Sequence, residues 1–306
     1  ANKTENANAS LIFGAGNKVT NSYRPVNGFN AGPLSNALQK AINTGDTDDM
    51  INALGDLVKD SGGSVLAIGG ANIADYAQLS KLVGVGNKLT GTDGHESKYN
   101  MIDGYLNIGK NINHVSVIGS ENTVEDTDDA LVFGNKQKLT GATGSIILGS
   151  GDRTITTNVS DAVSIGHNAN VEKAGGVALG SWSVANTDRG VAGYDPAAGD
   201  HANDTTGTWK ATAAAVSVGK AADPTGAAGS SAITRQITNV AAGTQDTDAV
   251  NVAQLKAVQT AADASKVHFF SVKGNSSDEN YNNDGATGDR ALAVGVLSLI
   301  HISEPT

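Results

Sequence analysis

A short glycine-containing pattern recurs along this chain and constrains its fold more than any other feature. The pattern is an apolar residue, a small or apolar residue, a further apolar residue and Gly, often followed by Asn and another apolar residue. In its best-kept stretch, from Gly119 to Gly180, successive glycines are separated by 15, 15, 17 and 14 residues. A fixed period of this length, with one short strand in each unit, predicts a solenoid of stacked rungs.

Each unit has room for two short strands and two turns, so every rung is expected to be a thin layer of β-structure. The Gly permits the positive φ angle of a turn at the strand end. The Asn that follows is also expected in a turn, because Asn tolerates the left-handed region and bonds its own backbone. The predicted structural glycines are Gly14, Gly69, Gly109, Gly119, Gly134, Gly149, Gly166, Gly180 and Gly219.

The composition indicates that such rungs have a thin core. Aromatic residues make up only 4% of the chain, Gly occurs 38 times, and the apolar residues are mainly small. Stacking buries part of the apolar surface of each rung, and lateral assembly with other copies would bury the rest. We therefore expect a homo-oligomer.

Two segments interrupt the repeat. The first, residues 31–62, has apolar residues at helical spacing and predicts an inserted helical hairpin, with one face made by Leu34, Leu38, Ala41 and Ile42 and a buried stripe on the second helix made by Ile51, Leu54 and Val58. The second, residues 186–214, is rich in Gly and Asp and predicts a long exposed loop. Its Tyr194 and Trp209 are candidate contacts for a ligand, although packing of both rings onto the solenoid is the simpler interpretation.

After Gly219 the pattern changes to the sequence RQITNVAAGTQDTDAVNVAQL, which covers residues 235–255. This segment resembles the neck motif of trimeric autotransporter adhesins, and the upstream repeats resemble the YadA-like head of the same family. The residues that carry the neck resemblance are Arg235, Gln236, Ile237, Asn239, Val240, Gly243, Asp248, Ala249, Val250, Asn251, Val252, Gln254 and Leu255.

The resemblance implies a mainly β fold: a left-handed parallel β-roll head that forms a homotrimer, and a neck that narrows onto a coiled coil. The following helix has the required alternation of three and four residues, at Val252, Leu255, Gln259 and Ala262. The family also implies the bacterial cell surface or outer membrane as location, and host matrix or cell-surface molecules as partners. We expect the export signal and the membrane anchor to lie outside this sequence.

These features divide the chain into segments. We expect a first head repeat (1–30), the helical insertion (31–62), the main head repeats (63–185), the loop (186–214), a last rung with a connector (215–234), the neck and short coiled coil (235–265), a strand with the start of a second head (266–296), and a tail (297–306) that resembles a translated sequencing adapter and that we exclude from the fold.

Other chemistry is not indicated. The net charge of −10 argues against binding of nucleic acid, and the absence of Cys excludes disulfides and thiolate metal sites. No stretch of about 18 apolar residues is present. The histidines show no metal-ligand spacing, and neither a phosphate-binding loop nor a nucleophile elbow occurs. We expect no catalytic residue, cofactor or metal.

Two alternatives remain. Ile165, Val171 and Val177 are six apart, as in left-handed β-helix hexapeptide acyltransferases, where His114 or His167 would be the catalytic base. The six-residue spacing does not persist, and the neck motif has no place in such an enzyme. Alternatively, this segment is a structural spacer and a different part of the protein binds the ligand.

The ligand is the least constrained part of the prediction. Related heads carry motifs of the form Asn-Ser-Val-Ala-Ile-Gly that are linked to collagen binding, and residues 162–166 are similar but depart from that motif. Val163, Ser164 and Ile165 are therefore candidate contacts, beside Tyr194 and Trp209.

Overall fold

The computed structural model describes residues 1–25, 31–59, 62–195, 199–223 and 230–265, with short pieces at 274–277, 281–282, 286 and 292–295. The chain forms two compact units, Ala1–Gln236 and Ile237–Thr306. The predicted strand at 266–273 and the tail at 297–306 lie outside the described residues, and the described pieces after residue 265 contain no strand.

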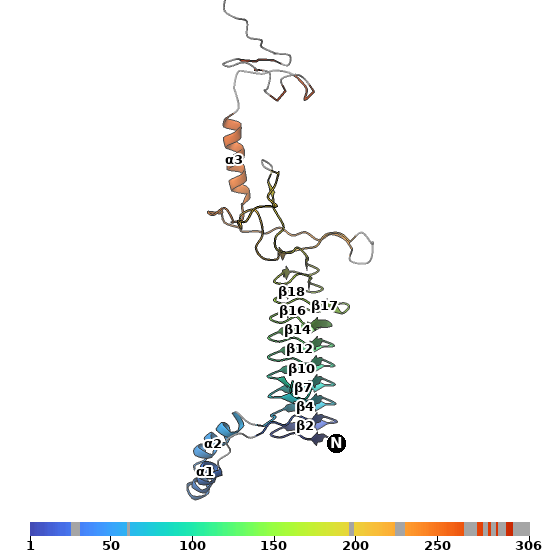
Figure 1. Ribbon diagram of the computed structural model, residues 1–306, viewed down its shortest axis with the longest axis vertical. Helices are drawn as coiled ribbons and strands as arrows, with labels where there is room; N and C mark the ends of the chain where they lie inside the picture. Colours follow the sequence, from blue (N-terminus) through green and yellow to red (C-terminus); the bar gives the residue numbers. More distant parts are fainter. Residues whose placement is uncertain are drawn as a thin grey trace, which may run out of the picture. The chain divides into compact units, whose positions relative to one another are not determined.

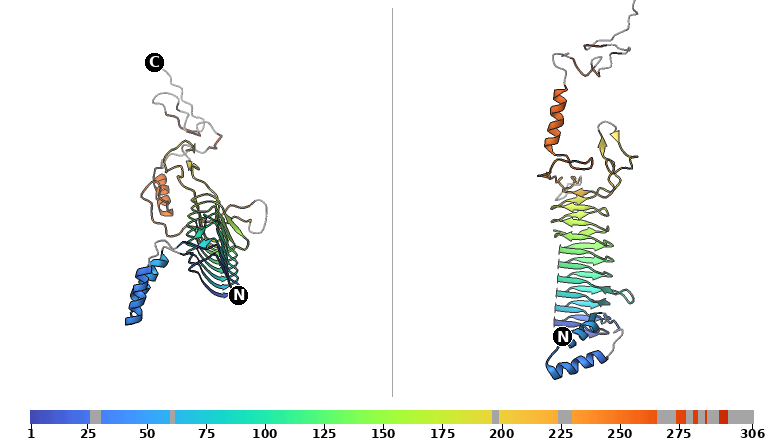
Figure 2. Two further views of the ribbon diagram at one scale, coloured as in Figure 1. Left: turned by 60° about the horizontal axis from the view of Figure 1, so that its bottom comes forward. Right: turned by 90° about the vertical axis from the view of Figure 1, so that its left-hand side faces the viewer.

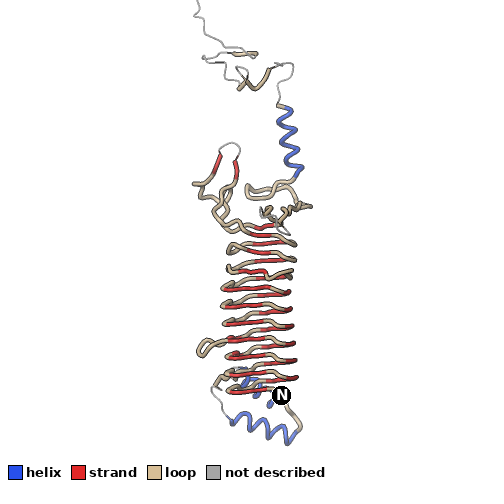
Figure 3. Tube along the Cα trace, turned by 90° about the vertical axis from the view of Figure 1, so that its right-hand side faces the viewer, coloured by secondary structure: helices blue, strands red, loops and turns tan. Residues whose placement is uncertain are grey.

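The first unit is a stack of rungs built on two long parallel sheets, which Figures 1 and 3 show from different sides. One sheet has ten strands, and its neighbouring members pair in register along the stack. Its strands are β2 (Leu11–Ala15), β4 (Leu66–Gly70), β7 (Lys81–Val85), β10 (Met101–Tyr105), β12 (Ser116–Ser120), β14 (Leu131–Asn135), β16 (Ile146–Leu148), β18 (Val163–Ile165), β20 (Val177–Leu179) and β24 (Val216–Ser217).

The second long sheet has eight strands, all parallel to one another. Its strands are β1 (Lys3–Glu5), β3 (Lys18–Thr20), β5 (Ile73–Asp75), β8 (Lys88–Thr90), β11 (Ile108–Lys110), β13 (Thr123–Glu125), β15 (Gln137–Thr140) and β17 (Ile155–Thr157). Three two-stranded pairs complete the described strands: β6 (Ala77–Gln78) with β9 (Ser97–Lys98), β19 (Asn170–Val171) with β21 (Val184–Ala185), and the antiparallel β22 (Tyr194–Asp195) with β23 (Gly199–Asp200). The predicted parallel β-solenoid is confirmed.

The core between the two sheets is as thin as the composition predicts. Each strand of a regular rung turns one apolar side chain inward, such as Leu82 facing Leu89, or Val132 facing Leu139, and all four are fully buried. The side view in Figure 2 (right) shows how closely successive rungs follow one another. Burial within a rung depends on the rungs above and below it, because no rung has a second layer of its own.

The asparagines of the repeat lie in the predicted connection between the two strands of a rung, but outside the left-handed region, and their side chains form a buried ladder inside the roll. The Nδ2 of Asn72 donates to Oδ1 of Asn17 at 2.9 Å and to the carbonyl oxygen of Gly84 at 2.9 Å. The same pair of bonds recurs on the later rungs, so every amide links its own rung to both neighbours. The ladder satisfies carbonyls that the core would otherwise leave unpaired. Its members are Asn17, Asn72, Asn87, Asn107 and Asn122.

The first interruption is the expected helical hairpin, made by α1 (Ala31–Thr44) and α2 (Asp48–Lys59). The predicted buried stripe of α2 is wrong at Ile51, which is 59% exposed. On α1, Ile42 of the predicted apolar face is 74% exposed, whereas Ala37 outside that face is buried. Two short helices that pack mainly on each other cannot cover all their apolar residues. The side chains of Leu54 and Val58 lie outside the description.

The second interruption is more ordered than the predicted loop. It contains the hairpin of β22 and β23, and a bridge joins Ala192 to Lys210. The second unit contains α3 (Val252–Ala264), where the neck resemblance predicts a helix. The predicted fold class is thus confirmed in its β-roll, its inserted helices and its C-terminal helix.

Candidate functional site

The outer face of the ten-stranded sheet carries mostly apolar side chains. Because side chains alternate along a strand, the first and third residues of each strand point outward. The third positions, which lie in register, are Phe13, Ile68, Val83, Asp103, Ile118, Phe133, Leu148, Ile165 and Leu179. Phe13 is 56% exposed and Leu179 is 45% exposed. A contiguous apolar surface of this length marks an association face.

One polar interruption lies in the middle of this face. Asp103 takes the third position of β10, and Lys81 takes the first position of the neighbouring β7. Their charged atoms are 3.7 Å apart, with both side chains 40% exposed, so the two charges partly neutralise each other.

The outer face of the eight-stranded sheet has a different composition. Its outward positions are largely charged or hydroxylated, with Ile73 and Ile108 as the apolar exceptions. The polar members include Lys18, Asp75, Lys88, Thr90, Lys110, Thr123, Glu125, Lys138, Thr140 and Thr156. One sheet is thus suited to association and the other to solvent.

Most of the predicted structural glycines lie in a single column of the ten-stranded sheet. Gly14 pairs with Gly69, and Gly119 pairs with Gly134, each with a positive φ angle. A Cβ atom on Gly119 would collide with the carbonyl oxygen of Gly134. The column therefore excludes side chains for two independent reasons, backbone conformation and the close approach of the next rung.

Gly109 does not belong to this column, which corrects its assignment. It lies in β11 of the eight-stranded sheet and pairs with Leu89 and Val124. The column position on that rung is Gly104, which pairs with Gly84 and Gly119. The local sequence is ambiguous because both Gly104 and Gly109 follow an alternating strand.

The three candidate contacts on β18, Val163, Ser164 and Ile165, do not point the same way. Ser164 is only 3% exposed and points into the core, so its side chain does not form part of a surface. Val163 and Ile165 are half-buried members of the apolar outer face. A collagen-like ligand would have to compete for this face with any association of the sheets.

The candidate aromatic residues of the insertion also differ from each other. Tyr194 is 83% exposed, whereas Trp209 is 36% exposed and stacks on His201 with ring centroids 4.4 Å apart. Nε2 of His201 lies 2.9 Å from Asp195, and Nδ1 lies 3.4 Å from Asp204. The backbone N–H of Thr206, with its hydroxyl, holds the pKa of Asp204 below its ordinary value. Trp209 thus packs within the insertion, and Tyr194 is available for contact.

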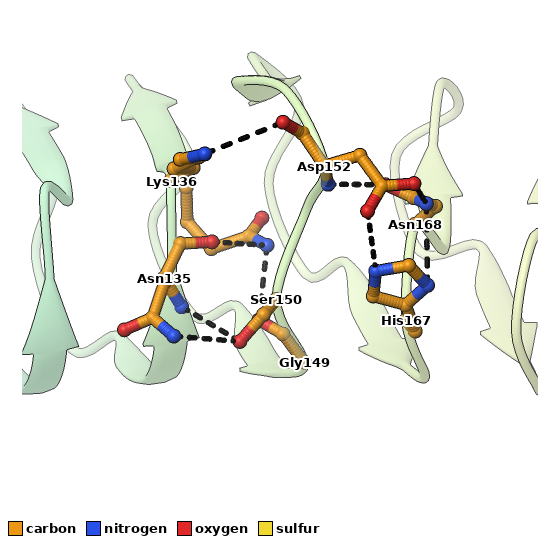
Figure 4. A network of polar contacts seen from close by, with 8 residues as sticks. Asn135, Lys136, Gly149, Ser150, Asp152, His167 and Asn168 are labelled. Carbon is orange, nitrogen blue, oxygen red and sulfur yellow. Dashed lines mark hydrogen bonds and ion pairs between the residues drawn. The ribbon is translucent and has the colours of Figure 1, made fainter.

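The histidine required by the acyltransferase alternative belongs to a structural network at the edge of the roll. Figure 4 shows His167 beside Asp152, with Nε2 3.1 Å from the carboxylate. Asn168 donates to the same carboxylate at 2.7 Å and accepts from the Asp152 N–H. Equivalent residues of the regular rungs are 15 apart, not 18 as three hexapeptides would require. No group of residues suited to holding a metal ion occurs in the described part of the chain.

Arg235, at the start of the neck motif, ties the end of the first unit to its last rungs. Its guanidinium donates to the carbonyl oxygens of Val218 and Ser181, the latter at 2.7 Å, and to the hydroxyl of Ser183 at 3.1 Å. A planar group with five donors suits several acceptors in one place.

The remaining neck residues build a compact turn ahead of α3. Asn251 caps the helix, and its side chain forms a reciprocal capping box with Gln254. Gln254 also accepts from the N–H of Gly243 and donates to its carbonyl oxygen. Asp248 accepts from the backbone N–H of Thr244 and from that of Gln245, which lower the pKa of its carboxyl group.

The apolar residues of the neck and of α3 have no cover within this unit. No residue of α3 is buried, and Leu255 is 64% exposed. The exposed set comprises Ile237, Val250, Val252, Leu255 and Val258. An isolated helix of this length is marginal in water, so its stability depends on packing against another surface. Among the described helices, none has the length and apolarity needed to cross a bilayer.

The neck and part of the chain are similar to known adhesins. Residues 236–278 match the family model for the coiled stalk of trimeric autotransporter adhesin. The autotransporter adhesin BadA of Bartonella henselae is 51% identical over 83 residues, which are 27% of this chain and 2% of BadA. The solved collagen-binding domain of the Yersinia adhesin YadA aligns with 61% of this chain and 86% of its own length, at 21% identity and a TM-score of 0.31.

The family model overlaps the neck motif at residues 235–255 and the capped helix that follows it. The stacked parallel rungs upstream agree with the head expected in the same family. Residues 236–278 are thus similar to the coiled stalk of trimeric autotransporter adhesins, and BadA is similar to 27% of the chain.

Proposed function

We propose that three copies of this chain associate through the apolar faces of their ten-stranded sheets. The main support is that outward apolar side chains recur at nearly every rung from Phe13 to Leu179. In the single chain these side chains are exposed or half-buried. Burial stabilises by about 25 cal/mol for each Å² of apolar surface removed from water. A face that repeats over nine rungs offers enough surface for a permanent interface.

The helix after the neck supports the same assembly. Val252 and Leu255 are exposed, and Gln259 and Ala262 continue the seam at spacings of four and three. Three such helices would pack these residues in a short coiled coil. The neck residues named above would then hold the turn that feeds each chain into the coil.

The assembled protein attaches bacteria to host matrix, host cells or other bacteria from the cell surface. The matched family and relative are adhesins, which supports binding rather than catalysis. The outer face of the eight-stranded sheet presents similar charged and hydroxyl side chains on successive rungs. A trimer would present three such faces. Many weak contacts of this kind raise avidity without any single strong site.

The contact region proposed first is the insertion that carries Tyr194. The apolar neighbours Val163 and Ile165 belong to the proposed interface and are therefore weaker candidates. Collagen remains a useful first probe because residues 162–166 are similar to a collagen-linked motif. A spacer role is the alternative if no ligand is found.

Light scattering on the purified chain, combined with binding to a panel of matrix proteins and cells, tests this function. We expect a trimer that persists on dilution and binds at least one surface in the panel. A folded monomer would contradict the assembly. A stable trimer that binds no matrix protein or cell would favour the spacer.

A further inference from the structure

The rung pattern breaks at one place, between β17 and β19. The eight-stranded sheet ends at β17, and β19 pairs only with β21 in a separate sheet. The buried apolar residues divide at the same place, because one core cluster extends to Ile147 and a second begins at Ala162. The break coincides with the change of glycine spacing from 15 to 17 and then 14 residues.

The interrupted ladder leaves buried polar atoms without partners. Within the described residues, Oε1 of Gln137, Oγ1 of Thr157 and Oδ1 of Asn170 are buried and accept no hydrogen bond. Thr157 and Asn170 lie on β17 and β19, on the two sides of the break, and Gln137 lies one rung earlier on β15. Such atoms are rare in native proteins and are usually satisfied by water or by a bound group.

A cavity of about 380 Å³ opens beside the break. This volume lies at the lower end of the range of about 300–1,000 Å³ that is typical of small-ligand sites. Its walls include Asn168, Asn170, Glu172 and Trp182, with Arg153 on the side of β17. The network in Figure 4 fixes Asn168, which is only 6% exposed, by two hydrogen bonds to Asp152.

Trp182 lies at the wall of this cavity, at the corner of its rung. Its φ angle is +62°, in the left-handed region, as at the equivalent corner positions Leu106, Glu121 and Lys136. Its ring meets the edge of His167, with centroids 6.3 Å apart, and Nζ of Lys220 lies 5.1 Å from the ring centroid.

The chemistry of the walls indicates the class of ligand. Arg153 and Lys220 are balanced by Glu172 and Asp223, so the cavity is not built for a phosphate or another strong anion. Amide, carboxylate and cationic groups together provide both donors and acceptors. Sugar hydroxyls are donors and acceptors as well, and the C–H face of a sugar ring packs on an indole. We propose that this cavity binds a neutral saccharide, which deepens the attachment function proposed above and rests on it for its biological role.

Saturation-transfer NMR with lactose and N-acetylglucosamine on the intact protein tests the proposal. We expect transfer to sugar ring protons, and an affinity at least about tenfold weaker in Trp182→Asn, because Asn tolerates the left-handed backbone but lacks the ring. Trp209→Asn is the matched control and should bind as the native chain does, because Trp209 is not part of the cavity wall. Glu172→Gln changes an exposed side chain and should weaken binding without unfolding the protein.

Several outcomes would overturn the saccharide site. These are absence of transfer to either neutral sugar, unchanged affinity in both cavity variants, or binding only of a heparin fragment. Matrix binding that survives deglycosylation and does not change in Trp182→Asn would leave the attachment function standing and remove this inference. If the trimer binds a saccharide but binds no matrix protein or cell, the saccharide site would be supported and the attachment function would be contradicted.

Discussion

The two long sheets share one backbone geometry and differ in what they turn outward. Both pair in register every rung, and both point alternate side chains into the same thin core. The ten-stranded sheet carries apolar residues such as Ile118 on its outer face, whereas the equivalent face of the eight-stranded sheet carries residues such as Thr123. The alternation of inward and outward side chains is the same in both sheets, so it does not decide which face becomes an interface. The type of residue at the outward positions decides this.

Introducing a charge on each face tests this contrast most strongly. Ile118→Lys should abolish the trimer, because each copy would bury an ammonium whose neighbouring carboxylate, Asp103, is already paired with Lys81, at a cost of about 3–5 kcal/mol. The measurement is molar mass by light scattering at micromolar concentration. Thr123→Lys, on the same rung but on the polar face, is the control and should remain trimeric. Dissociation in both variants, or in neither, would contradict the assignment of the faces.

Glycine substitutions sharpen the contrast within each sheet. Gly119→Ala should reduce the free energy of unfolding by about 3–5 kcal/mol, because it combines a strained φ angle with a collision against backbone. Gly109→Ala should have a smaller effect, since its Cβ would meet the end of the Ile112 side chain at 2.6 Å and its φ angle is not in the strained range. Chemical denaturation of both variants measures the difference. Equal losses would show that the two glycine positions are equivalent after all.

The helix after the neck should behave like the apolar face. Leu255→Glu should lower the melting temperature of the coiled coil, because a buried Leu contributes about 1.5–3 kcal/mol. Circular dichroism at 222 nm follows the melting. Lys256→Glu also introduces a carboxylate on the same turn but lies outside the predicted seam. If Lys256→Glu proves as damaging as Leu255→Glu, the seam has been placed on the wrong side.

The smallest expected effect concerns pH. Two backbone N–H groups depress the pKa of Asp248 below its ordinary value, so the bonds of its carboxylate stabilise the neck turn above that ordinary value. They are lost as the pH falls through the depressed pKa. Amide shifts of Thr244 and Gln245 should therefore change only as the pH falls below the ordinary pKa of an Asp side chain, about 3.9. In Asp248→Asn the same shifts should stay flat, and a matching titration there would assign the transition to another group.

The glycine spacing and alternation predicted the stacked parallel rungs, and the neck motif predicted the position of the capped helix. The insertion of two helices also followed from the helical spacing of apolar residues in residues 31–62. These features depend on local sequence and a fixed period, which a single chain displays directly.

Other features depend on how rungs meet and were not predicted. The Asn ladder was mistaken for turn chemistry, because a turn and a buried amide both follow Gly at the same spacing. The Asn residues recur with the same period as the glycines, and this shared period could have indicated a ladder between rungs. Burial of Ser164 follows from its inward register with Ile147 and Ala178. The cavity beside Trp182 depends on the break after β17, where the period changes.

The ladder has a consequence for how such chains can change. Asn17 and Asn72 are 55 positions apart in the chain and Asn87 and Asn107 are 20 apart, yet each pair is joined as though the rungs were adjacent repeats. Residues inserted at a corner between two rungs therefore do not disturb the hydrogen bonds that join those rungs. Gene duplication can therefore lengthen the protein by whole repeats. Recombination can insert a new folded segment at a corner while the stacked rungs keep their structure.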